Sequence, residues 1–180
     1  MPPREDRTDA DLVAALNRGD ADAFDALYFR YRDWVVRLAH RFTGNVDDAL
    51  DVMQEAFAYL FGKFPGFVLT ARMTTFLYPV VRNLSIAARR KRGRLVSDDL
   101  LYNPIAPPRR QDDPDDLAAV LRSLPDIQRE VLLMRFVDDL KLSEIAEALS
   151  IPEGTVKSRL HNALSALKRD PRVKEFFELE

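Results

Sequence analysis

The stretch LSEIAEALSIPEGTVKSR, residues 142–159, restricts the possible folds of this chain more than any other stretch does. Ser143 is a good helix N-cap, and apolar residues follow it at helical spacing. After a short break, Pro152 suits the first turn of a new helix, because its missing N–H has no partner there. Glu153 then adds negative charge at the positive end of that helix. Two short helices joined by a tight turn form a helix-turn-helix, whose second helix can enter the major groove of DNA.

The second predicted helix has an apolar stripe and an opposite polar face. The stripe consists of Val156, Leu160, Ala163, Leu164 and Leu167. The polar face consists of Thr155, Lys157, Ser158, Arg159 and His161. Side chains of these types reach both phosphates and base edges, which favours a DNA-binding function. A plain helical hairpin with a solvated polar face is the alternative that this stretch alone leaves open.

The composition is that of a globular protein with no metal or redox chemistry. The chain has 180 residues, of which 47% are hydrophobic and 31% charged, so it can form one domain or two small ones. It contains no cysteine, and His40 and His161 lie far apart, so we expect no disulfide, metal site or cofactor. It has no long apolar run, and its first residues lack the features of a signal peptide, so we expect a cytoplasmic protein.

The N-terminal part of the chain predicts three successive helices. Asp9 can cap a short helix, which Gly19 ends, and Asp20 opens a longer helix, which Gly44 ends. Asn45 can cap the third helix. The inward faces consist of Phe24, Leu27, Tyr28, Tyr31, Val35, Leu38 and Phe42 in the second helix and Leu50, Met53, Phe57, Leu60 and Phe64 in the third.

The opposite side of the third helix is acidic. It carries Asp47, Asp48, Asp51, Gln54 and Glu55, with no basic residue among them. Clustered carboxylates can serve acid–base catalysis or hold magnesium. Helical spacing turns these side chains outward, however, and no polar cluster elsewhere converges on them. A solvated acidic face and a binding surface both remain open at this point.

A loop and a basic helix follow the acidic helix. The loop is predicted at 65–74, PGFVLTARMT, where the apolar side chains could pack down or hold a ligand. The next helix contains Pro79, either in its first turn or at a kink. Its basic face consists of Arg82, Asn83 and the run of basic residues at 89–94. This face is an electrostatic footprint for phosphate, because the helix dipole alone explains only one or two of these arginines.

The stretch 96–116 predicts a flexible linker, because it is rich in proline and aspartate and lacks periodicity. It separates a helical module at 1–95 from a second module at 117–180. In the second module, further helices near Leu117 and from Pro125 or Asp126 precede the helix-turn-helix. The predicted fold class is therefore all-α, with two small helical domains.

Three segments together resemble a known family. DALDVMQEAFAYLF, FLYPVVRNLSIAARRKR and LRSLPDIQREVLLMRFVDDLKLSEIAEALSIPEGTVKSRLHNAL are similar to bacterial RNA polymerase sigma factors of the sigma-70 family, extracytoplasmic-function (ECF) group. The resemblance covers residues 20–168. LuxR-type regulators share the SEIAEALSIPEGTVKSRL pattern, so the acidic helix upstream makes the match specific.

The resemblance implies a function and a set of site residues. A sigma factor binds core RNA polymerase and directs promoter-specific initiation without covalent chemistry, so no catalytic residue is expected. Contacts to the clamp helices of the β′ subunit would be made by Asp48, Asp51, Gln54 and Glu55. Contacts to the −10 element would be made by Phe67, Thr70, Arg72, Thr74, Arg82, Asn83, Arg89 and Arg90. Contacts to the −35 element would be made by Thr155, Lys157, Ser158, Arg159 and His161.

Two details of the implied mechanism concern partners. The loop at 67–74 matches the loop that captures a base extruded from the non-template strand, which fits an apolar loop beside arginines. Further implied partners are the β flap of polymerase, promoter DNA and an anti-sigma factor.

Two alternatives compete with this interpretation. A LuxR-like regulator would act without polymerase, and a carboxylate-dependent enzyme would need the acidic residues to converge in a pocket with a metal.

Overall fold

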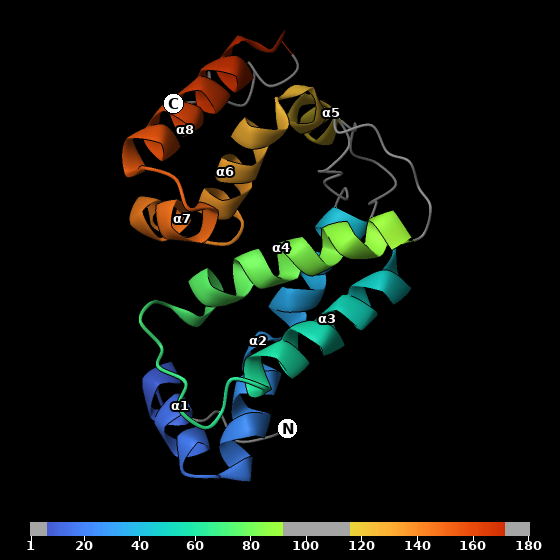
Figure 1. Cartoon of the computed structure of the whole chain (residues 1–180). Coiled ribbons are helices and arrows are strands. Elements are labelled where there is room, and N and C mark those ends of the chain that lie inside the picture. Colours follow the sequence, from blue (N-terminus) through green and yellow to red (C-terminus); the bar gives the residue numbers. More distant parts are fainter. Residues whose placement is uncertain (1–6, 92–115, 172–180) are drawn as a thin grey trace. The chain divides into compact units, whose positions relative to one another are not determined.

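A computed structural model describes residues 7–91 and 116–171 and folds them into eight α-helices and no strand (Figure 1). The chain divides into two compact units, Met1–Gly93 and Arg94–Glu180. The predicted all-α fold is confirmed. The linker predicted at 96–116 lies, apart from its last residue, outside the described residues.

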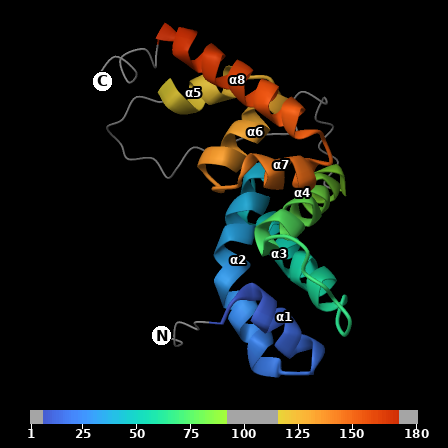
Figure 2. The same cartoon turned by 90° about the vertical axis from the view of Figure 1, so that its left-hand side faces the viewer.

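The first unit contains four helices. These are α1 (Asp9–Asn17), α2 (Ala21–Thr43), α3 (Val46–Phe61) and α4 (Met73–Lys91). Helices α2, α3 and α4 pack against one another, and α1 packs against α2 (Figure 2). The largest fully buried side chains include Leu27, Leu38 and Phe42 of α2, Leu60 of α3, and Leu77 and Tyr78 of α4. Apolar residues at helical spacing thus form one shared core, as the sequence predicts.

The boundaries of α2 and α3 follow the predicted caps. The side chain of Asp20 accepts a hydrogen bond from the N–H of Asp22 (3.0 Å), and that of Asn45 accepts one from the N–H of Asp48 (3.0 Å). Gly44 ends α2 with φ 70°, in the left-handed region where glycine carries no Cβ penalty. These three cap predictions are confirmed.

The N-cap of α1 is Thr8, so the prediction of Asp9 is wrong. The hydroxyl of Thr8 accepts a bond from the N–H of Asp11 (3.2 Å), and the carboxylate of Asp11 accepts one from the N–H of Thr8 (3.0 Å). This reciprocal pair is a capping box. Asp9 is therefore the first helical residue, and its carboxylate instead accepts hydrogen bonds from Arg30 (2.7 Å) and Tyr31 of α2.

The predictions for Phe24, Leu50 and the bounds of the loop also need correction, and Phe24 is 38% exposed rather than inward-facing. Leu50 is 40% exposed rather than inward-facing, because Ala49 and Ala56 occupy that part of the buried stripe. Helix α4 already begins at Met73, so the connecting loop spans 62–72 and Thr74 is helical. Pro79 lies well inside α4, which excludes the first of the two positions expected for it, and at this interior position it cannot donate the usual helical hydrogen bond.

The second unit contains α5 (Asp116–Ser123), α6 (Asp126–Phe136), α7 (Leu142–Leu149) and α8 (Glu153–Arg169). Helix α8 packs against α6 and α7. One core cluster consists of Val120, Leu124, Leu132, Ala163 and Leu167, with Leu121, Leu160 and Leu164 partly buried against it. The apolar stripe predicted for the second helix of the helix-turn-helix therefore does face the core.

The helix-turn-helix is present, with shifted caps. Helix α7 begins at Leu142, and the carboxylate of Glu144 accepts a hydrogen bond from the N–H of Lys141 (2.7 Å), so Ser143 is a helical residue rather than the N-cap. Pro152 is the N-cap residue of α8, one position before the first turn. Ser150 makes the turn between the helices with φ 54°. None of the described helices combines the length and apolarity that spanning a membrane requires.

Candidate polymerase and nucleic-acid interfaces

The acidic face of α3 is smaller than predicted. Asp47, Asp51, Gln54 and Glu55 are exposed, whereas Asp48 is only 6% exposed. The Asn45 cap makes Asp48 the third residue of the helix, and its side chain is buried in the unit rather than turned outward. The description of Asp48 as part of the outward face is therefore wrong. Negative charge in this first turn still complements the helix dipole.

The remaining carboxylates of this face do not form a metal-binding cluster within the described residues. Within 7–91 and 116–171, no group of three or more histidine, cysteine, aspartate or glutamate side chains is arranged to hold a metal ion. Asp51, Gln54 and Glu55 are spaced at three and four residues along one side of α3 and lie open to solvent. These three residues thus form an exposed, acidic strip of α3.

The 62–72 loop is fixed to α1 by one side chain, that of Asn17. Its Oδ1 accepts hydrogen bonds from the N–H groups of Gly66 (2.7 Å) and Phe67 (3.2 Å), and its Nδ2 donates to the carbonyl of Phe67 (2.8 Å). Asn17 lies 49 and 50 residues before these partners. Sequence reasoning missed this residue, because no local pattern indicates a partner so far along the chain.

The apolar residues of the loop divide between packing and exposure. The ring of Phe67 lies 4.9 Å from that of Phe76 and 5.4 Å from that of Phe64, measured between centroids. Phe76 in turn stacks on Tyr59 of α3 at 6.3 Å. Val68, by contrast, is 73% exposed. The loop therefore has an aromatic base and an exposed apolar tip.

The polar residues predicted for the −10 element are not equally accessible. Thr70 and Arg72 in the loop are exposed, as are Asn83 and Arg90 on α4. Arg82 is half-buried. The side chain of Thr74 is buried, because this residue lies in the first turn of α4.

Arg89 makes a structural contact within the unit. Its Nη1 donates a hydrogen bond to the carbonyl of Phe42 (3.0 Å) near the end of α2. The last carbonyls of a helix lack intrahelical partners and carry partial negative charge, so a guanidinium is favourable there. Part of the predicted basic face thus stabilises the packing of α4 on α2. The basic residues at 92–94 lie outside the described residues.

Helix α8 presents the polar face predicted for it. Lys157, Ser158 and His161 are exposed, whereas Thr155 and Arg159 are half-buried. The ammonium group of Lys157 lies 2.8 Å from the carboxylate of Glu153, one turn earlier. This pair is solvent-exposed, so it contributes at most about 1 kcal/mol and can open to meet phosphate. The hydroxyl of Ser158 donates to the carbonyl of Thr155 (3.0 Å).

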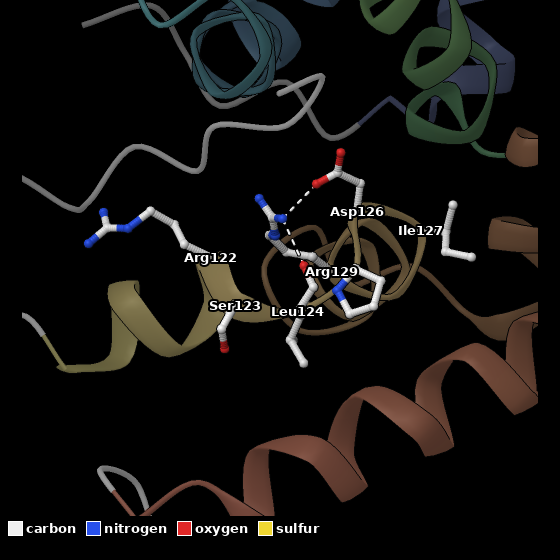
Figure 3. A pocket seen from close by; sticks show the side chains of 7 residues that line it. Arg122, Ser123, Leu124, Asp126, Ile127 and Arg129 are labelled. Atoms are coloured by element: carbon white, nitrogen blue, oxygen red, sulfur yellow. Dashed lines mark hydrogen bonds and ion pairs between the residues drawn. The ribbon is translucent and has the colours of Figure 1, made fainter. Parts of the chain in front are cut away.

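A pocket at the α5–α6 turn is lined by residues that include Arg129, a buried residue whose hydrogen bonds stabilise the turn. Arg129 is only 5% exposed, and its Nη2 donates to the carbonyl of Leu124 (2.8 Å) and to Asp126 (2.6 Å) (Figure 3). Arg122, which also lines the pocket, extends away from this pair (Figure 3). A buried guanidinium needs such partners. Sequence reasoning missed Arg129, because helical periodicity does not predict a buried arginine.

Comparisons with known proteins decide the family. Residues 27–95 match the family model for sigma-70 region 2, and residues 115–167 match the model for sigma-70, region 4. The ECF RNA polymerase sigma factor SigW of Bacillus subtilis is 30% identical over 189 residues, covering 89% of this chain and 95% of SigW. The chain belongs to the ECF sigma factors.

Other relatives agree with this membership. The ECF RNA polymerase sigma-E factor of Escherichia coli is 28% identical over 180 residues, covering 91% of this sigma factor and 94% of the relative. Two solved structures have the same fold. They are CnrH in complex with the cytosolic domain of CnrY (TM-score 0.63, 19% identity, 96% and 98% coverage) and RpoE of Bartonella quintana in complex with the anti-sigma factor NepR (TM-score 0.62, 23% identity, 87% and 98% coverage).

Family membership resolves the main alternatives. A LuxR-like regulator would leave the first unit without a function, whereas residues 27–95 match sigma-70 region 2. As a member of this family, the protein is a transcription initiation factor that acts with core RNA polymerase at promoters, and it is not an enzyme by family.

Proposed function

We propose that this sigma factor divides its work among three surfaces. The exposed side of α3 docks on the β′ clamp helices, α4 and the 62–72 loop recognise the −10 element, and α8 recognises the −35 element. The observation that carries the proposal is the separation of charge. The face of α3 is acidic, while exposed basic residues lie on α4 and α8.

Docking on polymerase is assigned to Asp51, Gln54 and Glu55. All three side chains are exposed. Hydrogen bonds to a carboxylate are stronger than hydrogen bonds between two neutral groups. Asp48 is excluded from direct contact because it is buried. Its proposed role is to add negative charge within the first turn of α3, near the positive end of the helix dipole.

Recognition of the −10 element is assigned to the loop and the adjacent face of α4. The exposed tip at Val68 and the aromatic base formed by Phe67 and Phe76 provide apolar surface for an extruded base. Stacking on aromatic rings stabilises single-stranded bases by about 1–3 kcal/mol each. Exposed Arg72 and Arg90 supply positive charge for the backbone.

Recognition of the −35 element is assigned to the polar face of α8, which includes exposed Lys157 and half-buried Arg159. Arg159 can contact guanine O6 and N7 with two hydrogen bonds, while Lys157 binds phosphate as a point charge. In the free protein Lys157 is already paired with Glu153. When DNA binds, Glu153 therefore competes with phosphate for Lys157. We propose that DNA binding exchanges this ion pair for a phosphate contact.

Control by a protein partner is also part of the proposal. CnrH and the RpoE of Bartonella quintana have the same fold, and their structures hold a second protein, for RpoE the anti-sigma factor NepR. We propose that an anti-sigma factor binds this chain and covers its polymerase-binding and DNA-binding surfaces. Since bacterial RNA polymerase is cytoplasmic, the cytoplasm is the proposed place of action.

The first test measures binding to core polymerase. Charge reversal at two positions, Asp51→Arg with Glu55→Arg, is expected to weaken co-purification with core polymerase at least tenfold, because like charges would then face the clamp helices. Asp25→Arg on α2 is the control for charge reversal outside the proposed surface, and it makes half the charge change of the double variant at an exposed position. Surface changes alter stability by only about 0.5 kcal/mol each, so the fold should persist.

Run-off transcription with the same proteins tests the function itself. The wild-type protein and Asp25→Arg should direct core polymerase to defined start sites on genomic promoter fragments, and the double variant should not. Retention of core binding by the double variant, at the wild-type level, would refute the α3 assignment. Absence of any directed initiation by the wild-type protein would refute the proposed function as a whole.

A further inference from the structure

Asn17 uses its whole side-chain amide on the backbone of the 62–72 loop. The oxygen accepts two hydrogen bonds, from Gly66 (2.7 Å) and Phe67 (3.2 Å), and the nitrogen donates one to Phe67 (2.8 Å). An asparagine amide offers one accepting and one donating group, and here both face the loop. The result is a specific clamp between the end of α1 and one point of the loop.

The clamp sets the conformation of the loop at its first apolar residues. Gly66 has φ +102°, a conformation that residues with a Cβ rarely adopt. Both the N–H and the C=O of Phe67 bond to Asn17, while the Phe67 ring lies against Phe64 and Phe76. The direction of the Phe67 side chain is therefore fixed by backbone bonds as well as by ring packing.

Hydrogen bonds to α2 hold helix α1, which carries Asn17, in place. Asp9 at its first turn accepts hydrogen bonds from Arg30 (2.7 Å) and Tyr31 of α2, and Arg30 also donates to the carbonyl of Arg7 (2.8 Å). The family model for region 2 begins at residue 27, so α1 lies outside the matched segment. The contact between α1 and the loop thus adds to what family membership implies.

We propose that Asn17 is a positioning residue for −10 recognition. It holds the backbone of the 62–72 loop in the shape that receives the extruded base, and it acts through Gly66 and Phe67 without touching DNA. A loop ordered before binding does not lose that conformational entropy when the base enters. The inference rests on the proposed function of this loop.

The test compares Asn17→Ala with a control on the same helix. Thr8→Ala removes the N-cap of α1 at the end away from the loop, so it weakens the helix without removing a bond to Gly66 or Phe67. The measurement is run-off transcription from a promoter library with the −10 and −35 elements randomised separately. Asn17→Ala is expected to reduce discrimination at the position of the captured base about tenfold, the loss expected for about one net hydrogen bond. Thr8→Ala should leave this discrimination unchanged.

A conservative variant and a structural readout separate positioning from simple destabilisation. Asn17→Asp keeps an oxygen that can accept from Gly66 and Phe67 but loses the donor to the carbonyl of Phe67, so its discrimination should lie between those of Asn17→Ala and the wild type. Amide exchange at these two residues, measured in the full chain, should accelerate in Asn17→Ala and remain slow in Asn17→Asp and Thr8→Ala. The −35 preference and core binding should be unchanged in all three variants.

The outcomes distinguish this inference from the function on which it rests. Equal loss of −10 discrimination in Asn17→Ala and Thr8→Ala, or wild-type discrimination in Asn17→Ala, would overturn the positioning role. Phe67→Ala serves as the reference for the loop itself. If Phe67→Ala alters −10 discrimination while Asn17→Ala does not, the loop function stands and the clamp role fails. If neither variant alters it, the proposed function of the loop fails as well.

Discussion

At the scale of single residues, neighbouring aspartates have different roles because of their place in a turn. The carboxylate of Asp11 accepts hydrogen bonds from the hydroxyl (2.6 Å) and the N–H (3.0 Å) of Thr8. These bonds favour the ionised form, so the side-chain bond first, and then the backbone bond, lower the pKa of Asp11 below its ordinary value. Asp9 instead faces α2. Proximity in sequence therefore does not decide which aspartate joins Thr8 in the capping box of α1.

The capping box predicts a measurable shift in the titration of Asp11. In Thr8→Ala the pKa of Asp11 should rise toward its ordinary value, since the hydroxyl bond that lowers it most is absent. A lowered folded-state pKa stabilises the fold above the unfolded pKa, and this contribution disappears as the pH falls through the folded pKa. The stability difference between wild type and Thr8→Ala should thus shrink under acid conditions. Carboxyl NMR titration checks the first expectation, and an unchanged pKa of Asp11 would contradict it.

Because the hydroxyl of Tyr31 donates a hydrogen bond to Asp9, we expect its removal to lower the stability of the fold. Burial raises the pKa of Tyr31 well above its ordinary value, and the hydrogen bond to Asp9 raises it further. The phenol therefore stays protonated at neutral pH, and its stabilising contribution persists below the unfolded pKa of about 10 and falls only at higher pH. Tyr31→Phe should cost about 1–3 kcal/mol in urea unfolding, because it removes one partner of a part-buried hydrogen bond. Tyr28→Phe, a change of the same size on α2, should cost less than about 0.5 kcal/mol.

At the scale of secondary-structure elements, the sequence predicts helices well and their ends less well. Apolar periodicity identifies α2, α3 and α8 because each buries one continuous stripe. Caps at α2 and α3 were predictable, since a glycine stands directly before each of the two N-cap residues, Asp20 and Asn45, and marks the boundary. At α1 and α7 several polar residues are adjacent, and side chains three positions later, Asp11 and Glu144, decide the boundary.

The contacts between elements were beyond prediction from sequence. The Asn17 clamp on the loop and the bond from Arg89 to Phe42 each join residues more than 40 positions apart. Such bonds depend on how helices pack, which periodicity does not specify. Asp48 illustrates the same limit for burial, because the acidic pattern predicts an outward face while this one side chain is buried. The exposed acidic residues were nevertheless predicted correctly as a surface.

The contacts that Arg129 makes at the α5–α6 turn predict that its substitution destabilises this part of the second unit. Arg129→Met should destabilise the second unit by about 1–3 kcal/mol, because it leaves the carbonyl of Leu124 without its guanidinium donor and removes the ion pair with Asp126. Arg122→Met is the matched control, since Arg122 lines the same pocket but is exposed (Figure 3). Amide exchange in the full chain should accelerate in α5 and α6 of Arg129→Met and remain unchanged in α2 and α3. Equal effects of the two variants would contradict this explanation.

At the scale of the whole molecule, the two units have separate hydrophobic cores. The first unit buries Leu38, Phe42 and Leu77 among others, and the second has its own cluster around Val120 and Leu132. A substitution in one unit therefore leaves the core of the other unchanged. This independence makes it possible to assign promoter preferences to one unit at a time.

Promoter recognition should divide between the units in a way that a library can measure. Arg159→Ala should cost about 1–3 kcal/mol and weaken the preference at one −35 position, because a bidentate contact to guanine is lost. Lys157→Ala should weaken binding to all sequences alike and reduce the salt slope by about one, because its contact is to phosphate. Asn83→Ala, at an exposed position of α4, should act on the −10 element alone. Transcription from promoters with each element randomised separately provides the measurement. A change of −10 preference in Arg159→Ala, or of −35 preference in Asn83→Ala, would show that the two units do not read their elements independently.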